Sequence, residues 1–158
     1  MFNIKYIQNE NNNFNFKYFL ATSSCSSDDD STTIQSTPIT FSEIGKGGLF
    51  GNGTEGIAQS NMVIDNTTDW QNLMTQMDSY SNVTTLFSET NIDFNTYIVI
   101  GIFLEVKPSG WEVEIINIEE NTTDIMVSKT ETEAINSVIT QPFHIVKIPI
   151  TDKPIEFE

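Results

Sequence analysis

The chain has one cysteine, one histidine and no arginine, so that lysine supplies all seven of its basic side chains. A single cysteine cannot form an intrachain disulfide bond. Without arginine, the chain lacks the planar guanidinium group that holds phosphate and carboxylate ligands through two hydrogen bonds at once. No apolar run approaches the roughly 20 residues that a membrane-spanning helix needs. We therefore expect that any attachment to a membrane is an anchor.

Acidic residues outnumber basic ones by 22 to seven, which gives a net charge of -15. Nucleic-acid binding depends on lysine and arginine that neutralise phosphates, so this composition excludes it. Acidic charge of this size mainly keeps a protein soluble. About 120 of the 158 residues follow Pro38, which is enough for one domain with a modest hydrophobic core.

Cys25 is followed by Ser-Ser-Asp-Asp-Asp and then by a Ser/Thr-rich stretch that ends at Pro38. This pattern resembles the processing site of a bacterial surface lipoprotein, where the cysteine becomes the lipidated first residue. The apolar run before it, Phe14–Ala21, is short and interrupted, so residues 1–24 are predicted to be a degenerate signal or leader segment. Residues 25–38 are predicted to be a flexible tether. The resemblance implies an outer-membrane lipoprotein of the cell envelope. The alternative is a cytoplasmic chain with a free thiol in a disordered leader.

The folded part is expected to begin near Ile39 with a β-hairpin. Ile39–Ile44 and Ile57–Ile64 have the composition of strands, and the stretch Gly45–Gly56 between them contains six glycines. Glycine is common in turns and loops, so this stretch is predicted to be a mobile loop that joins two paired strands.

One amphipathic helix is predicted after this hairpin. Asn66 and Thr67 are suitable N-cap residues, and Asp69 would lie in the first turn, where the helix dipole favours a negative charge. Apolar side chains recur at helical spacing and form a stripe that needs a sheet to cover: Trp70, Leu73, Met74 and Met77.

The second half of the chain is predicted to be strands. Tyr97–Leu104 is continuously apolar, so it should be a central strand with both faces covered, one of them by the helix. The alternating pairs Trp111/Val113/Ile115, Ile125/Val127 and Phe143/Ile145 predict half-buried antiparallel strands. Turns are expected at Asn121–Thr122 and at Glu131–Asn136. The sequence thus predicts an α+β fold, with a mostly antiparallel β-sheet and one main helix packed on it, and a monomer.

No motif predicts catalysis, a cofactor or a metal ion. Gly51–Gly56 matches G-x-G-x-x-G formally, but a strand and not a helix is expected to follow it. His144 is a single histidine inside a strand, without a clustered ligand or nucleophile. Glu112 and Glu114 alternate along a strand, which is typical of its solvated side. Asp28–Asp30 could attract calcium only loosely, because the glycine turn and bidentate glutamate of an EF-hand loop are missing. We expect a protein without enzymatic activity.

Three segments carry a family resemblance. The run Gly101–Ile115, with Lys-Pro-Ser-Gly-Trp at its centre, is similar to the signature of the protease-complex subunit PrcB family, C-terminal domain. Val63–Asp65 leading to Asp69-Trp70 resembles the family's strand-to-helix connection, and Gln141–Pro149 resembles its closing strand. The resemblance covers residues 39–149 and identifies 39–158 as a PrcB-like domain. It implies a noncatalytic role in assembling or stabilising a surface protease complex.

The turn at the centre of that signature is the predicted partner-binding site, formed by Lys107, Pro108, Ser109, Gly110 and Trp111. It would present a basic and an aromatic side chain next to each other, a combination frequent in interface hot spots. Two of its residues depart from the family, which usually has two glycines and a tyrosine where this chain has Gly110 and Trp111. The simplest alternative is that Trp111 fills the core as the first inward residue of its strand. A protease inhibitor, and a carbohydrate-binding lipoprotein that uses Trp111 and Tyr97, are the other functions left open.

Overall fold

The computed structural model describes residues 36–108, 110–133 and 138–158. Its elements are β1 (Thr37–Pro38), β2 (Ser42–Leu49), β3 (Ser60–Ile64), α1 (Thr67–Met77), a 3-10 helix η1 (Val83–Leu86), β4 (Tyr97–Phe103), β5 (Trp111–Glu120), β6 (Ile125–Glu133), β7 (Gln141–Pro149) and β8 (Ile155–Phe157). The α+β prediction, with mostly antiparallel strands and one main helix, is confirmed. Cys25, Asp28–Asp30 and Ser109, the predicted leader and most of the predicted tether lie outside the described residues.

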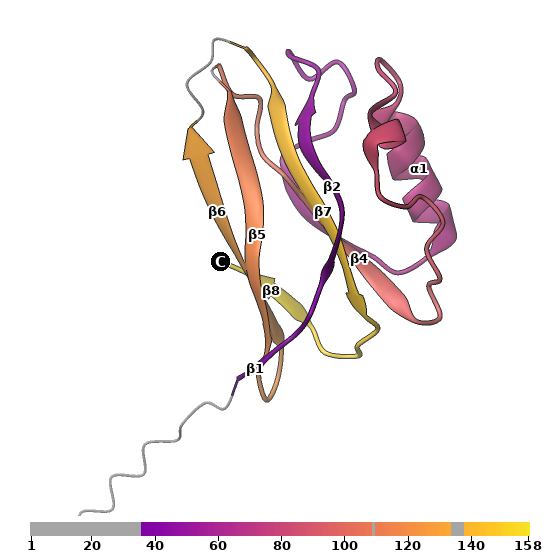
Figure 1. Cartoon of the computed structure of the whole chain (residues 1–158), viewed down its shortest axis with the longest axis vertical. Coiled ribbons are helices and arrows are strands. Elements are labelled where there is room, and N and C mark those ends of the chain that lie inside the picture. The colour runs from indigo at the N-terminus through magenta and orange to yellow at the C-terminus, as the bar shows by residue number, and fades with distance from the viewer. Residues whose placement is uncertain (1–35, 109, 134–137) are drawn as a thin grey trace, which may run out of the picture. The chain divides into compact units, whose positions relative to one another are not determined.

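The strands form two sheets. The β4 sheet has the order β2-β7-β4-β3, and the β5 sheet has the order β1-β5-β6-β8. Every pairing is antiparallel except that of β6 with β8, which is parallel. Figure 1 shows α1 against the β4 sheet, on the side away from β5 and β6. The described domain therefore has three layers, with the β4 sheet in the middle.

The middle position of β4 explains its continuous apolar sequence. Val99 and Phe103 belong to the cluster that packs against α1, whereas Ile98, Ile100 and Ile102 belong to the cluster between the two sheets. These five side chains are at most 4 % exposed. The prediction of a central strand covered on both faces is confirmed, and the second cover is the β5 sheet.

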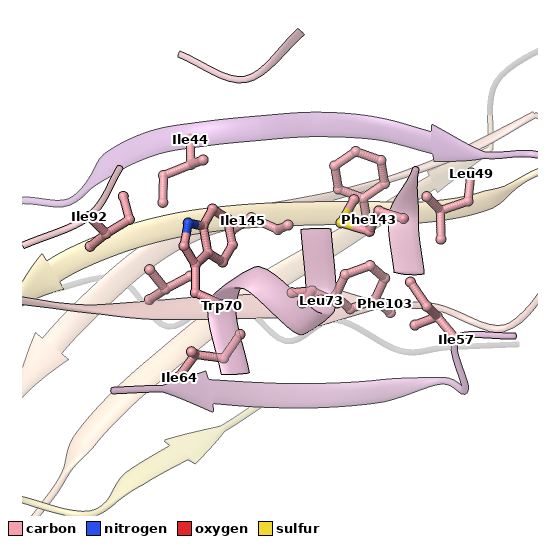
Figure 2. Close-up of a cluster of buried hydrophobic side chains, with 12 residues drawn as sticks. Ile44, Leu49, Ile57, Ile64, Trp70, Leu73, Ile92, Phe103, Phe143 and Ile145 are labelled. Atoms are coloured by element: carbon pink, nitrogen blue, oxygen red, sulfur yellow. The ribbon is translucent and has the colours of Figure 1, made fainter. Parts of the chain in front are cut away.

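Helix α1 begins where the sequence predicts. The Asn66 side-chain oxygen accepts a hydrogen bond from the Asp69 N–H (2.9 Å), which satisfies one of the unpaired amides of the first turn. Of the predicted stripe, Trp70, Leu73 and Met77 are buried. Figure 2 shows Trp70 within the cluster between α1 and the β4 sheet, near Ile64 and Ile145.

The predicted hairpin is wrong. β2 pairs with β7, and β3 pairs with β4, so the two strands lie at opposite edges of one sheet. The first five residues of the predicted glycine loop are part of β2, including Gly45, Gly47 and Gly48. A glycine in a strand often marks a close approach by another group. At Gly45 that group is the ring of Phe87, which occupies the space where a side chain would lie.

Gly45→Ala is expected to destabilise the domain by about 1–3 kcal/mol, because the new methyl group would overlap the Phe87 ring. An ideal Cβ at this position would lie only 2.6 Å from Cε1 of Phe87. Gly47→Ala is the matched control in the same strand, since its Cβ would lie 3.7 Å from the Phe143 ring, an ordinary contact. Urea unfolding of both variants measures the difference. Equal loss of stability in the two would contradict this packing.

The edges of the predicted segments also need correction. β1 pairs with Glu119–Glu120, so ordered structure begins before Ile39 and includes the last two residues of the predicted tether. The Asn121–Thr122 turn is confirmed, since it lies between β5 and β6. The turn predicted at Glu131–Asn136 starts too early, because β6 continues to Glu133; residues 134–137 lie outside the described part.

None of the helices described is both long and apolar enough to cross a membrane.

Candidate functional site

Lys107 and Trp111 lie next to each other, as the sequence predicts. The Lys107 ammonium is 4.8 Å from the centre of the Trp111 ring. It also forms an ion pair with Glu105 (3.0 Å) and lies 3.9 Å from Glu131. The backbone of Lys107 exchanges two hydrogen bonds with Thr140, at 2.8 and 3.2 Å. Its side chain is only 18 % exposed. Lys107 therefore supports the indole ring and is held by its own contacts.

Trp111 occupies the rim between the core and the solvent. Along β5, Val113 and Ile115 are buried and Glu112 and Glu114 are exposed, so Trp111 lies on the inward face. It is nevertheless only partly buried. Trp111 thus has the inward position that the core alternative expects, but it belongs to neither of the two clusters of buried core residues. Of its neighbours in the predicted site, Pro108 is exposed and Gly110 is buried.

The indole of Trp111 lines a cleft of about 520 Å³. We call it the Trp111 cleft; its lining residues are Glu43, Lys46, Gly47, Gly48, Gly110, Trp111, Glu112, Val113 and Thr140. One wall comes from β2, the edge strand of the β4 sheet, and the other comes from the start of β5. The cleft thus lies where the two sheets meet. Its volume falls within the roughly 300–1,000 Å³ of typical ligand sites.

Acidic side chains surround a single lysine at this cleft. The Lys46 ammonium lies 3.2 Å from the Glu114 carboxylate and 4.0 Å from that of Glu112, so it links β2 to β5. Both glutamates are exposed, which confirms that they lie on the solvated face of their strand. Glu43 adds a third carboxylate on the cleft wall. The three carboxylates outnumber the one ammonium group, which gives this region a negative potential.

His144 lies behind the cleft and joins the two sheets. It is 1 % exposed. The Ile115 N–H donates a hydrogen bond of 2.7 Å to its Nδ1, and its Nε2 lies 3.2 Å from the Glu43 carboxylate. Since Nδ1 accepts, the neutral ring carries its proton on Nε2 and donates it to Glu43. Burial lowers the pKa of His144 below its ordinary value, although the nearby Glu43 carboxylate opposes this shift.

His144 supplies a hydrogen-bond acceptor to β5. β1 pairs with β5 only at Glu119 and Glu120, so within the described residues no strand lies beside Ile115 on the β5 edge opposite β6. The imidazole supplies the acceptor that a neighbouring strand would otherwise provide, and an unpaired buried N–H is costly. His144 therefore has a structural role next to the cleft.

A second hollow lies on the face of β2 opposite the Trp111 cleft. Its volume is about 320 Å³. We call it the Leu86 pocket; its lining residues are Gly45, Lys46, Gly47, Gly48, Ser81, Asn82, Val83, Leu86, Phe87 and Phe143. Leu86 is 86 % exposed, the largest value among the exposed large hydrophobic side chains described. The two hollows share Lys46, Gly47 and Gly48, so that this part of β2 separates them.

One wall of the cleft, at Gly110 and Trp111, contains residues of the predicted site, whereas the other wall, from β2, does not. Lys46, Gly47 and Gly48 lie in the stretch predicted to be a loop, and they reach the cleft only through the pairing of β2 with β7, which no local pattern reveals. Tyr97 does not line the cleft. It pairs with Pro149 at the far end of β7, whereas Gly48 pairs with Pro142. Seven strand positions span about 23 Å, so the two-aromatic carbohydrate site is not formed.

The described residues contain no group of three or more His, Cys, Asp or Glu side chains that could hold a metal ion. Comparison of the chain with protein-family models, with curated proteins and with solved structures gives no match. The PrcB resemblance therefore stays a prediction from the sequence motifs, and the functional argument depends on the geometry of the site.

Proposed function

We propose that this chain is a noncatalytic protein-interaction domain that binds a segment of a partner protein in the Trp111 cleft. The observation that carries the proposal is a partly buried tryptophan that lines an open cleft at the junction of two sheets. Aromatic side chains dominate the energetics of many interfaces because they bury a large area with few rotatable bonds.

The surroundings of Trp111 support this proposal. Lys107 contacts the ring on one side and is itself held by Glu105 and by the Thr140 backbone. A side chain that is ordered before binding loses less conformational entropy when a partner arrives. The same contacts disfavour a protease inhibitor, since an inhibitory loop must offer its contact side chain to the enzyme and Lys107 is already engaged.

The proposal also includes a location in the cell. We place the domain at the cell envelope, anchored through a lipid on Cys25, because the Ser-Asp tract after that cysteine is typical of surface lipoproteins. A surface protease complex is the proposed partner class, following the PrcB resemblance. A lipid anchor would keep the domain near a membrane-bound partner and raise its effective concentration there.

Trp111→Ala is expected to weaken partner binding by at least about 30-fold while the domain stays folded, because hot-spot residues cost about 2 kcal/mol or more when truncated. The full chain, with and without the substitution, serves as bait for the envelope fraction of the host. Captured proteins are identified by mass spectrometry, and the affinity of the enriched partner is then measured. Circular dichroism and urea unfolding verify the fold.

The matched control is Ile116→Ala, which removes a 55 % exposed apolar side chain from the same strand, outside the cleft lining. We expect the wild-type and control baits to enrich the same protease and the Trp111→Ala bait to lose it. An identical set of proteins with all three baits, or no specific protein with any, would contradict the proposed function.

A carbohydrate is the second candidate ligand, because an indole ring and the carboxylates of Glu43 and Glu112 line one cleft. A glycan array probed with the full chain distinguishes the two candidates. Binding of a glycan that is lost in Trp111→Ala would favour the carbohydrate, and silence on the array would leave the protein partner.

A further inference from the structure

β2 is an edge strand with a partly covered edge. The Ser88 N–H donates to the Ile44 carbonyl (2.8 Å), and the Ser88 hydroxyl donates to the Glu43 carbonyl (2.7 Å). Beyond these two residues, the described part of the chain places no strand beside β2 except β7 on its inner side. Edge strands of this kind are templates for pairing with another chain.

The glycines of β2 open both faces of this edge. A Cβ on Gly47 would meet the ring of Phe143, a residue of the Leu86 pocket. A Cβ on Gly48 would lie 3.0 Å from Thr140, a residue of the Trp111 cleft. Successive residues of a strand point to opposite faces, and here the two missing side chains leave one hollow on each face.

We propose that the partner segment binds as an added β-strand along the edge of β2 at Lys46–Leu49. Its backbone pairs with β2, and its side chains point alternately into the Trp111 cleft and the Leu86 pocket. Strand addition gains affinity from main-chain hydrogen bonds and specificity from pockets for alternate side chains. This inference rests on the proposed function and specifies how the partner is recognised.

The chemistry of the two hollows defines the partner segment. Val83, Leu86 and Phe87 line the pocket with apolar side chains, which suits an aliphatic residue. The Trp111 cleft has an indole ring and an excess of carboxylates over its single lysine, which suits a lysine or arginine. Since neighbouring residues of a strand point to opposite faces, the segment carries a basic residue directly beside an aliphatic one.

The first test is selection of a displayed library of random decapeptides against the full chain. We expect enriched peptides to carry Lys or Arg next to Leu, Ile or Val, and their affinity to fall at least 10-fold in Trp111→Ala. Gly47→Leu, which fills the Leu86 pocket, should also weaken binding at least 10-fold, whereas Gly47→Ala should change it less than 3-fold. Enriched peptides without this pattern, or with equal affinity for both Gly47 variants, would overturn the assignment of the pockets.

Backbone methylation tests the added strand itself. The selected peptide is synthesised with N-methyl groups on one alternate set of residues or on the other. Pairing with β2 uses the amides of one set only, so we expect one peptide to lose at least 10-fold in affinity and the other to lose less than 3-fold. Equal affinities of the two methylated peptides, with binding still dependent on Trp111, would overturn strand addition and leave the proposed function intact. Failure to select any Trp111-dependent peptide would contradict both, and dimerisation of the chain through β2 would overturn the assignment of a foreign segment.

Discussion

Trp70→Ala is expected to lower the free energy of unfolding by about 3–5 kcal/mol, the range for truncating a buried tryptophan. Trp70 is 1 % exposed, and its ring stacks with Phe87 at a centroid distance of 6.0 Å. Figure 2 shows it surrounded by side chains from α1 and the β4 sheet, including Ile64 and Ile145. Its removal would leave a cavity between the helix and the middle layer. Urea unfolding followed by circular dichroism measures the loss.

Trp70→Phe is the control for the polar part of this side chain. The indole N–H donates a hydrogen bond of 2.8 Å to the Thr90 carbonyl. Phenylalanine keeps much of the apolar contact and removes this bond, so we expect a smaller loss of about 1–2 kcal/mol. A loss below about 1 kcal/mol for Trp70→Ala would contradict the packing of α1 on the β4 sheet.

His144→Phe is expected to destabilise the domain by about 2–4 kcal/mol at pH 7, because two polar groups lose their partner. The Ile115 N–H would have no acceptor at the open edge of β5, and Glu43 would lose the Nε2 donor. His144→Asn is the matched variant, since its side-chain oxygen can take the place of Nδ1. Equal stability of wild type and His144→Phe would contradict the proposed link between the sheets.

The same histidine predicts a pH dependence. Its pKa in the folded state is lowered from the ordinary value of 6.5, mainly by burial. The unfolded chain therefore binds the proton more readily, and the stability contributed by neutral His144 is lost as the pH falls below about 6.5 toward the lowered pKa. Between pH 7 and pH 5, the wild type should lose more stability than His144→Asn, in which all carboxylates remain. Parallel pH curves for the two proteins would contradict this.

Local features of the sequence were sufficient for α1 and for β4. The Asn66 cap, the acidic first turn and the apolar stripe all lie within one short segment, so no distant contact was needed to predict the helix. The continuous apolar run of β4 required two covered faces, and the structure has them. β5 and β6 were predicted as strands, but no local pattern shows that they form a second sheet separate from that of β4.

β2 was missed because its propensity and its environment disagree. Three glycines within eight residues favour a loop. The contact of Phe87 with Gly45 and the long pairing with β7 override that preference. Glu43 pairs with Val146, about a hundred residues away in the chain, and no local pattern contains such a register.

Only one wall of the candidate site could be predicted from the sequence, because the other wall depends on contacts between distant segments. Lys107 and Trp111 are close in sequence, so their contact could be inferred from a turn. The opposite wall, Lys46 to Gly48, reaches Trp111 only through the pairing of β2 with β7 and the packing of the two sheets. The resemblance to the PrcB family pointed to the turn and not to β2.

Hydrogen–deuterium exchange tests most directly whether a partner segment binds along the edge of β2 beside Trp111. The amides of the full chain are followed without ligand and with a saturating amount of the selected basic-aliphatic peptide. We expect slowed exchange at Lys46–Leu49 and near Trp111, because added backbone hydrogen bonds protect the edge of β2. Protection confined to α1 or to the β6–β8 side, with unchanged exchange along β2, would contradict it.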